Sequence, residues 1–200
     1  MADYTGKDIG KMILDCAARE FLKNGYENAS LRVIAKGAEA TTGIIYSRYK
    51  SKHELFKHLV DKAYCEVIQI VADSLEEICV PTSRLPAYEQ YYQRVIPRLF
   101  DYIVHHQKEI ELLTRCSTGT TYRNFIPKLL STEKEYTAVL WPSQFNKKPY
   151  SKDLIQTVSY SFYTTMFDFA LEGDLENSNI PYTEYLIQFF IGGWHKIFQN

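Results

Sequence analysis

The stretch that decides the fold covers residues 30–52 and reads SLRVIAKGAEATTGIIYSRYKSK. Leu31, Ile34 and Ala35 follow the spacing of residues that share one face of a helix. Ser30 stands directly before them, and its hydroxyl is suited to accept hydrogen bonds from the first backbone N–H groups of a helix. The pattern therefore predicts a short helix that starts after Ser30 and ends at the next glycine.

Two further helices are predicted, one on each side of this one. A second short helix begins at Thr41 or Thr42 and ends near Tyr49. A longer amphipathic helix covers residues 9–24 and ends at Gly25, because glycine readily takes the left-handed conformation of a helix cap. Three helices with a tight turn between the two short ones fit a helix-turn-helix, whose second short helix enters the major groove of DNA.

In that geometry, small polar residues at the start of the second short helix meet base edges, and hydroxyls and a lysine beyond them reach phosphate oxygens. A glycine there lets the backbone approach the groove wall. Arg32, on the first short helix, is suited to either a guanine edge or a phosphate. The expected DNA-contacting residues are Ser30, Arg32, Thr41, Thr42, Gly43, Ile44, Tyr46, Ser47 and Lys52.

Several of these residues also have a simpler structural interpretation. Thr41 and Thr42 would serve as an N-cap pair, Tyr46 as a core ring with an exposed hydroxyl, and Lys52 as a solvated charge. The charge distribution is compatible with an anionic partner without requiring one. Residues 1–52 hold nine Lys or Arg against six Asp or Glu, whereas the rest of the chain holds 14 against 18.

The rest of the 200-residue chain also has helical periodicity, and no alternating strand pattern of useful length occurs. Prolines and polar residues indicate a loop over residues 141–150, and Pro97 is expected to kink the helix that contains it. The further helices are predicted over residues 51–75, 85–106, 109–116, 122–140, 152–171 and 182–198. The fold class predicted from the sequence is therefore all-α.

The last two predicted helices are apolar around most of their circumference. Such helices must be covered on more than one side, and a chain of this length offers them little further cover. We therefore expect a second copy of the chain to pack on them. The expected interface residues are Leu154, Val158, Phe162, Phe189, Phe190, Gly193 and Trp194.

The amino-terminal pattern resembles the DNA-binding domain of TetR family transcriptional regulators over about residues 9–60. The residues that carry the resemblance are Ala17, Phe21, Gly25, Tyr26, Ser30, Leu31, Ile34, Ala35, Gly43, Ile45, Tyr46, Tyr49, Lys50, Ser51, Lys52 and Leu55. The resemblance implies a three-helix DNA-binding domain over residues 1–50, a larger helical effector-binding and dimerisation domain over 51–200, and a homodimer formed by the last two helices. It also implies a ligand-responsive regulator, most often a repressor that a small molecule releases from double-stranded operator DNA.

The resemblance further implies an effector cavity between the central helices. The abundance of aromatic residues in the chain suggests a flat or aromatic effector. Core packing is the simpler interpretation of each ring taken alone. The expected effector-binding residues are Tyr88, Tyr92, Tyr122, Phe125, Tyr163 and Phe167.

The turn between the two short helices departs from the family pattern. The family usually has Ala-Gly-Val there, whereas this chain has Ala38, Glu39 and Ala40. A left-handed Glu39 would cost about 1 kcal/mol relative to glycine. Ile44 and Ser47 also depart from the family's usual residues, so the operator sequence is not carried over.

Other function classes receive little support from the sequence. No apolar stretch approaches a membrane span, and the first residues lack a secretory signal, so we expect a cytoplasmic protein with no membrane partner. The four cysteines lack metal-ligand spacing, and no catalytic constellation stands out, so we expect no metal, no cofactor and no enzyme. Two alternatives remain open: a helical enzyme or small-molecule carrier with a vestigial DNA-binding head, and a purely structural dimerisation module.

Overall fold

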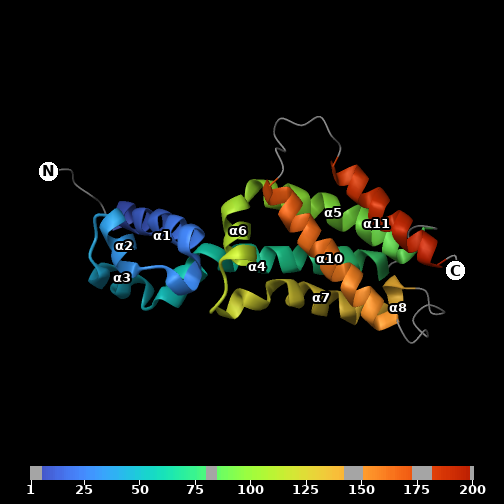
Figure 1. The fold of residues 1–200 in the computed structure, drawn as a ribbon, viewed down its shortest axis with the longest axis horizontal. Helices are drawn as coiled ribbons and strands as arrows, with labels where there is room; N and C mark the ends of the chain where they lie inside the picture. The colour runs from blue at the N-terminus through green and yellow to red at the C-terminus, as the bar shows by residue number, and fades with distance from the viewer. Residues whose placement is uncertain (1–5, 80–84, 142–150, 173–181, 199–200) are drawn as a thin grey trace. The chain divides into compact units, whose positions relative to one another are not determined.

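The computed structural model describes residues 6–79, 85–141, 151–172 and 182–198, and these form helices and short connections without any strand (Figure 1). The chain divides into two compact units. Unit 1 comprises Met1–Cys65 and Gln107–Phe125, and unit 2 comprises Glu66–His106 and Ile126–Asn200. Unit 1 therefore extends beyond the boundary expected at residue 50 and also includes the segment Gln107–Phe125 from the middle of the sequence.

Unit 1 contains the predicted helix-turn-helix, and the structure confirms its two short helices. The helices of this unit are α1 (Gly6–Asn28), α2 (Leu31–Gly37), α3 (Thr42–Tyr49), the first part of α4 (Lys52–Glu76), α6 (Gln107–Arg115) and the 3₁₀ turn η2 (Thr121–Asn124). Helix α1 packs against both α2 and α6. The apolar face of each helix meets in one core, in which Ile13, Phe21, Ile34, Ile45 and Phe56 are fully buried.

Gly25 interrupts α1 where the sequence predicts a helix end, and two helical segments meet there at a kink. Its φ of 69° and ψ of 167° lie in a region that is essentially restricted to glycine. The bend directs the N–H of Tyr26 to the carbonyl oxygen of Cys116, at 3.0 Å. A Cβ atom at position 25 would meet nothing within 4 Å, so the requirement for glycine is conformational rather than steric.

We expect Gly25→Ala to lower the free energy of unfolding by about 1–3 kcal/mol, because alanine must adopt this backbone conformation or break the bend. Gly43→Ala is the matched control, since Gly43 lies inside α3 and its Cβ would make only an ordinary 3.6 Å contact with Thr41 Oγ1. That control should be neutral or stabilise the protein by up to about 1 kcal/mol. Urea denaturation followed by circular dichroism measures both, and equal changes would show that Gly25 is not strained.

Glu39 adopts the left-handed conformation expected for the turn between α2 and α3. Its φ is 51°. The turn closes through hydrogen bonds from the N–H of Glu39 to the carbonyl of Lys36 and from the N–H of Ala40 to that of Ala35, at 3.3 and 2.9 Å. The backbone bonds of the turn thus hold a residue that lacks glycine's freedom.

Unit 2 is a bundle in which α5 packs against α10 and α11. Helix α5 begins two residues later than the predicted helix, because Pro86 is its N-cap, and Pro97 lies within it. Residues 142–150 of the predicted loop lie outside the described residues. The elements of this unit are the second part of α4, the 3₁₀ turn η1 (Glu77–Cys79), α5 (Ala87–His105), α7 (Phe125–Glu135, of which Phe125 belongs to unit 1), α8 (Thr137–Leu140), α10 (Ser151–Glu172) and α11 (Tyr182–Phe198).

Candidate functional site

The start of α3 presents one continuous polar face. Thr41 caps the helix, because its Oγ1 accepts a hydrogen bond from the N–H of Ile44 at 3.3 Å. Ile45 and Tyr49 turn inward and are 1% and 7% exposed. On the other side of the helix, Gly43, Tyr46 and Ser47 are exposed, and Thr42 and Ile44 are half-buried. The predicted base-reading and phosphate-contacting residues of α3 therefore share the solvent-facing side.

Two bulky side chains of unit 1 are unusually exposed. Tyr46 on α3 is 53% exposed and Val33 on α2 is 54% exposed. An exposed phenol is suited to a phosphate, and an exposed apolar group is suited to a thymine methyl. Val33 is not among the residues expected from the sequence, because a valine in a helical pattern is ordinarily assigned to the core. Its position away from the face formed by Ile34 and Ala35 could have indicated that it is exposed.

The structure corrects one expectation for Ser30. Its backbone takes the extended conformation of an N-cap, but its hydroxyl makes no capping hydrogen bond. Instead, the N–H of Ser30 donates to Oε1 of Glu20 on α1, at 3.0 Å. The carboxylate of Glu20, on the neighbouring helix, therefore fixes the backbone at the start of α2. Arg32 lies on the exposed side of α2.

Lys52 has partners inside unit 1. Its ammonium donates to the carbonyl oxygens of Glu27 and Ala29, at 3.0 and 2.9 Å, and lies 4.8 Å from the centroid of the Tyr26 ring. Burial lowers the pKa of Lys52, and the charges of Glu27 and Glu20 oppose that change. Two of its three N–H donors thus hold the end of α1, which leaves one for the predicted phosphate contact.

The expected effector-binding residues are buried, but they do not come together in one unit. Tyr122 and Phe125 belong to unit 1, where both rings pack on Tyr64 and the Tyr122 hydroxyl donates to Asp61 Oδ1 at 2.6 Å. Burial and this carboxylate raise the pKa of Tyr122. The other four, Tyr88, Tyr92, Tyr163 and Phe167, lie in the core of unit 2 and are at most 3% exposed.

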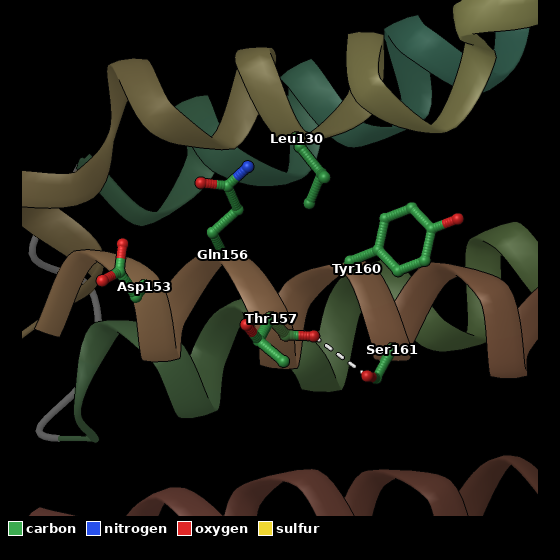
Figure 2. Close-up of a pocket in the computed structure, with 6 residues that line it drawn as sticks. All are labelled: Leu130, Asp153, Gln156, Thr157, Tyr160 and Ser161. Atoms are coloured by element: carbon green, nitrogen blue, oxygen red, sulfur yellow. Dashed lines mark hydrogen bonds between the residues drawn. The ribbon is translucent and has the colours of Figure 1, made fainter. Parts of the chain in front are cut away.

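The linings of two surface hollows in the described part of the chain include none of the expected effector residues. One of about 380 Å³ lies between α7 and α10 and is lined by Leu130, Asp153, Gln156, Thr157, Tyr160 and Ser161 (Figure 2). The other, of about 500 Å³, lies in unit 1 and is lined by His53, Gly119, Thr120, Thr121, Arg123 and Asn124. Within the described residues, no group of three His, Cys, Asp or Glu side chains is placed to hold a metal ion.

The expected interface residues fall into two classes. Phe162, Phe190 and Trp194 are buried within unit 2, and Leu154 and Val158 are half-buried. Phe189 is 72% exposed, and a Cβ added at Gly193 would meet no atom within 4 Å. Tyr185, which the sequence analysis did not select, is 58% exposed and lies four residues before Phe189. Tyr185, Phe189 and Gly193 form what we call the outer face of α11.

Comparison with known proteins agrees with the helix-turn-helix geometry. Residues 13–59 match the family model described as bacterial regulatory proteins, tetR family. Over these residues the chain has the sequence pattern of a TetR-family regulator. A protein of similar sequence, the uncharacterized HTH-type transcriptional regulator YhgD of Bacillus subtilis (strain 168), is 28% identical over 105 residues. That alignment covers 52% of this chain and 51% of YhgD, so the match spans about half the length of the curated relative.

Solved TetR structures share the fold along most of the chain. A TetR-family transcriptional regulator from Bordetella parapertussis 12822 has a TM-score of 0.66 at 15% identity, covering 92% of this chain and 94% of that one. NalD, the secondary repressor of the MexAB-OprM multidrug efflux pump in Pseudomonas aeruginosa, has a TM-score of 0.60 at 15% identity, covering 94% and 95%. The fold is therefore an amino-terminal helix-turn-helix followed by a larger helical part, as in the TetR-family transcriptional regulators that it resembles. None of the described helices has the length and apolar character needed to cross a bilayer.

Proposed function

We propose that this protein is a homodimeric, ligand-responsive repressor that binds double-stranded operator DNA through α3. The observation that carries the proposal is the solvent-facing side of α3, which gathers Thr42, Ile44, Tyr46 and Ser47 beyond a capped helix start. NalD, whose fold this chain shares, is a repressor, and this supports the proposed direction of control. A regulator that acts on operator DNA works in the cytoplasm.

The proposed mechanism places the α3 helices of two subunits in successive major grooves, about 34–36 Å apart. An effector in unit 2 favours a dimer conformation in which this spacing no longer matches the duplex. Such control requires a difference in binding free energy of about 1–3 kcal/mol between the two conformations. Helix α4 contributes residues to both units. A movement of this helix would therefore displace residues of both units.

The proposal is tested by selecting bound duplexes from a random DNA pool with the full chain. We expect Thr42→Ala and Ile44→Ala to change which sequence is selected, because the start of α3 meets base edges. Uniform weakening by both variants would show that neither residue reads bases. Failure of the full chain to enrich any duplex would contradict the proposal and favour the alternative of a vestigial head.

Lys52→Met separates the two roles of this lysine. If its remaining N–H binds phosphate, DNA affinity should fall for all sequences, and the salt dependence of binding should flatten by about one unit. Loss of the bonds to the carbonyls of Glu27 and Ala29 should lower the free energy of unfolding whether or not Lys52 touches DNA. An unchanged salt slope with lowered stability would assign Lys52 to the structure of unit 1 alone.

A further inference from the structure

Three oxygen atoms form a closed triangle in the core of unit 2. Glu133 on α7 is 5% exposed, and its Oε1 lies 2.7 Å from the hydroxyl oxygen of Tyr91 on α5 and 2.8 Å from that of Tyr163 on α10. The two phenol oxygens also lie 2.8 Å from each other. All three sides of the triangle therefore have hydrogen-bond length.

The triangle needs three protons, and an ionised Glu133 leaves it with two. The phenols supply one proton each, so with a carboxylate one pair of oxygens would face each other at 2.8 Å without a hydrogen between them. A protonated Glu133 completes a ring in which each oxygen donates once and accepts once. The geometry thus describes a neutral carboxylic acid.

The surroundings of Glu133 also favour the neutral acid. Burial raises the pKa of Glu133, and the hydroxyls of Tyr91, Tyr163 and Ser159 oppose that change. Tyr92 is the other titratable group that interacts with this carboxyl. Among the described residues, no Lys, Arg or His contributes to the pKa of Glu133. None of these groups is a cation that would balance an ionised Glu133, so the neutral acid is favoured.

A buried hydroxyl lies beside this cluster. Ser159 lies one turn before Tyr163 on α10 and is 2% exposed, and its Oγ completes no hydrogen bond with any described residue. It is nevertheless close enough to influence the carboxyl of Glu133. A buried hydroxyl of this kind costs about 1–3 kcal/mol unless it finds a partner. A ligand with several N–H donors would supply one.

A surface hollow lies between α7 and α10, the helices that carry Glu133 and Tyr163. Figure 2 shows Leu130 on α7 and Tyr160 on α10 at this hollow, and each lies three residues before a member of the triangle, Glu133 and Tyr163 respectively. The one charged residue that lines the hollow is Asp153, a carboxylate. An entering cation would therefore meet negative charge and no lining cation.

We propose that unit 2 binds an organic ammonium ion, which takes the place of the third proton at Glu133. This inference rests on the proposed effector function and names the effector's chemical class. On binding, the O–H bond of Glu133 breaks and its proton leaves to solvent, while the ammonium donates hydrogen bonds to the resulting carboxylate and to Ser159 Oγ. Buried aromatic faces nearby, including those of Tyr92 and Phe162, suit a cation.

The test compares 2-phenylethylamine, an ammonium ion at neutral pH, with 2-phenylethanol, a neutral molecule of similar shape. Calorimetric titration of the full chain at pH 6, in two buffers of different ionisation enthalpy, measures affinity and proton release together. We expect the amine to bind at least tenfold more tightly than the alcohol and to release about one proton, with affinity rising about tenfold per pH unit while Glu133 starts protonated.

Variants assign the effect to Glu133. Glu133→Gln keeps the shape of the side chain but should abolish both the preference for the amine and the proton release. Glu135→Gln, which removes an exposed carboxyl from the same helix, should leave both unchanged. If Glu133→Gln does not fold, carbon-13 spectra of glutamate-labelled wild-type protein replace it: the carboxyl of Glu133 should be protonated at pH 6 in the free protein and ionised with the amine bound.

Several results would overturn the inference: equal binding of amine and alcohol, retention of the preference in Glu133→Gln, an ionised Glu133 in the free protein, or no saturable binding of the amine. Operator binding in the same samples judges the proposed function separately. A chain that binds the alcohol and releases its operator, without proton release or a role for Glu133, would keep the proposed function and reject the ammonium ion.

Discussion

Trp194→Ala should lower the free energy of unfolding by about 3–5 kcal/mol, as expected for removal of a fully buried tryptophan from a core. Trp194 on α11 is 1% exposed, and its ring lies 4.4 Å from that of Trp141. Its Nε1 donates to the hydroxyl of Tyr92 at 3.1 Å, and that phenol is fully buried. The substitution therefore leaves a cavity and also removes the donor from a buried oxygen.

Urea denaturation followed by circular dichroism measures this loss. Trp194→Phe should fall between the wild type and Trp194→Ala, because it keeps much of the apolar volume but not the indole N–H. Gln188→Ala is the surface control on the same helix and should change stability by less than about 0.5 kcal/mol. A loss for Trp194→Ala no larger than that of the control would mean that α11 does not hold the core of unit 2.

Phe189→Asp should convert the proposed dimer to a folded monomer. Phe189 is the most exposed large apolar residue in the described part of the chain, and it lies between Tyr185 and Gly193 on the outer face of α11. At Gly193 the surface is open, so a second helix would approach the backbone closely there. A buried carboxylate without a partner in such an interface is strongly unfavourable.

Light scattering coupled to size-exclusion chromatography measures the mass of the variant, and circular dichroism checks that it stays folded. Affinity for the selected operator should fall at least about a hundredfold, because two linked heads bind far more tightly than one. Gln188→Glu adds the same charge at the adjacent exposed position and should remain a dimer. If Phe189→Asp is still a dimer, the subunits meet on a surface other than the outer face of α11.

The helix-turn-helix was predictable because its signals are local. The spacing of Leu31, Ile34 and Ala35, and the cap at Thr41, depend on residues within one or two turns, and the structure confirms both short helices and that cap. The same was true of Glu39, whose left-handed conformation follows from the shortness of the turn. The DNA contacts of α3 and the two-domain division stay predictions.

The site was less predictable where a side chain takes its partner from far along the sequence. Lys52 has the spacing of a phosphate ligand, yet its ammonium binds the carbonyls at the end of α1. No signal in the sequence indicates how the expected effector-binding aromatic residues divide between the two units. The spacing of each of them is equally compatible with the core of either unit. Helical periodicity predicts that a residue faces inward, but it does not predict which residues that side chain contacts.

The sequence alone determined the helical fold class, the two short helices at residues 31–37 and 42–49, and the surplus of apolar residues in the last two helices. Only the tertiary structure decided that Glu133, an unremarkable glutamate in the pattern of α7, is buried between Tyr91 and Tyr163. The physical reason is range: caps and periodicity act over a few residues, whereas this carboxyl meets partners 42 and 30 positions away, which are brought together only when three helices pack.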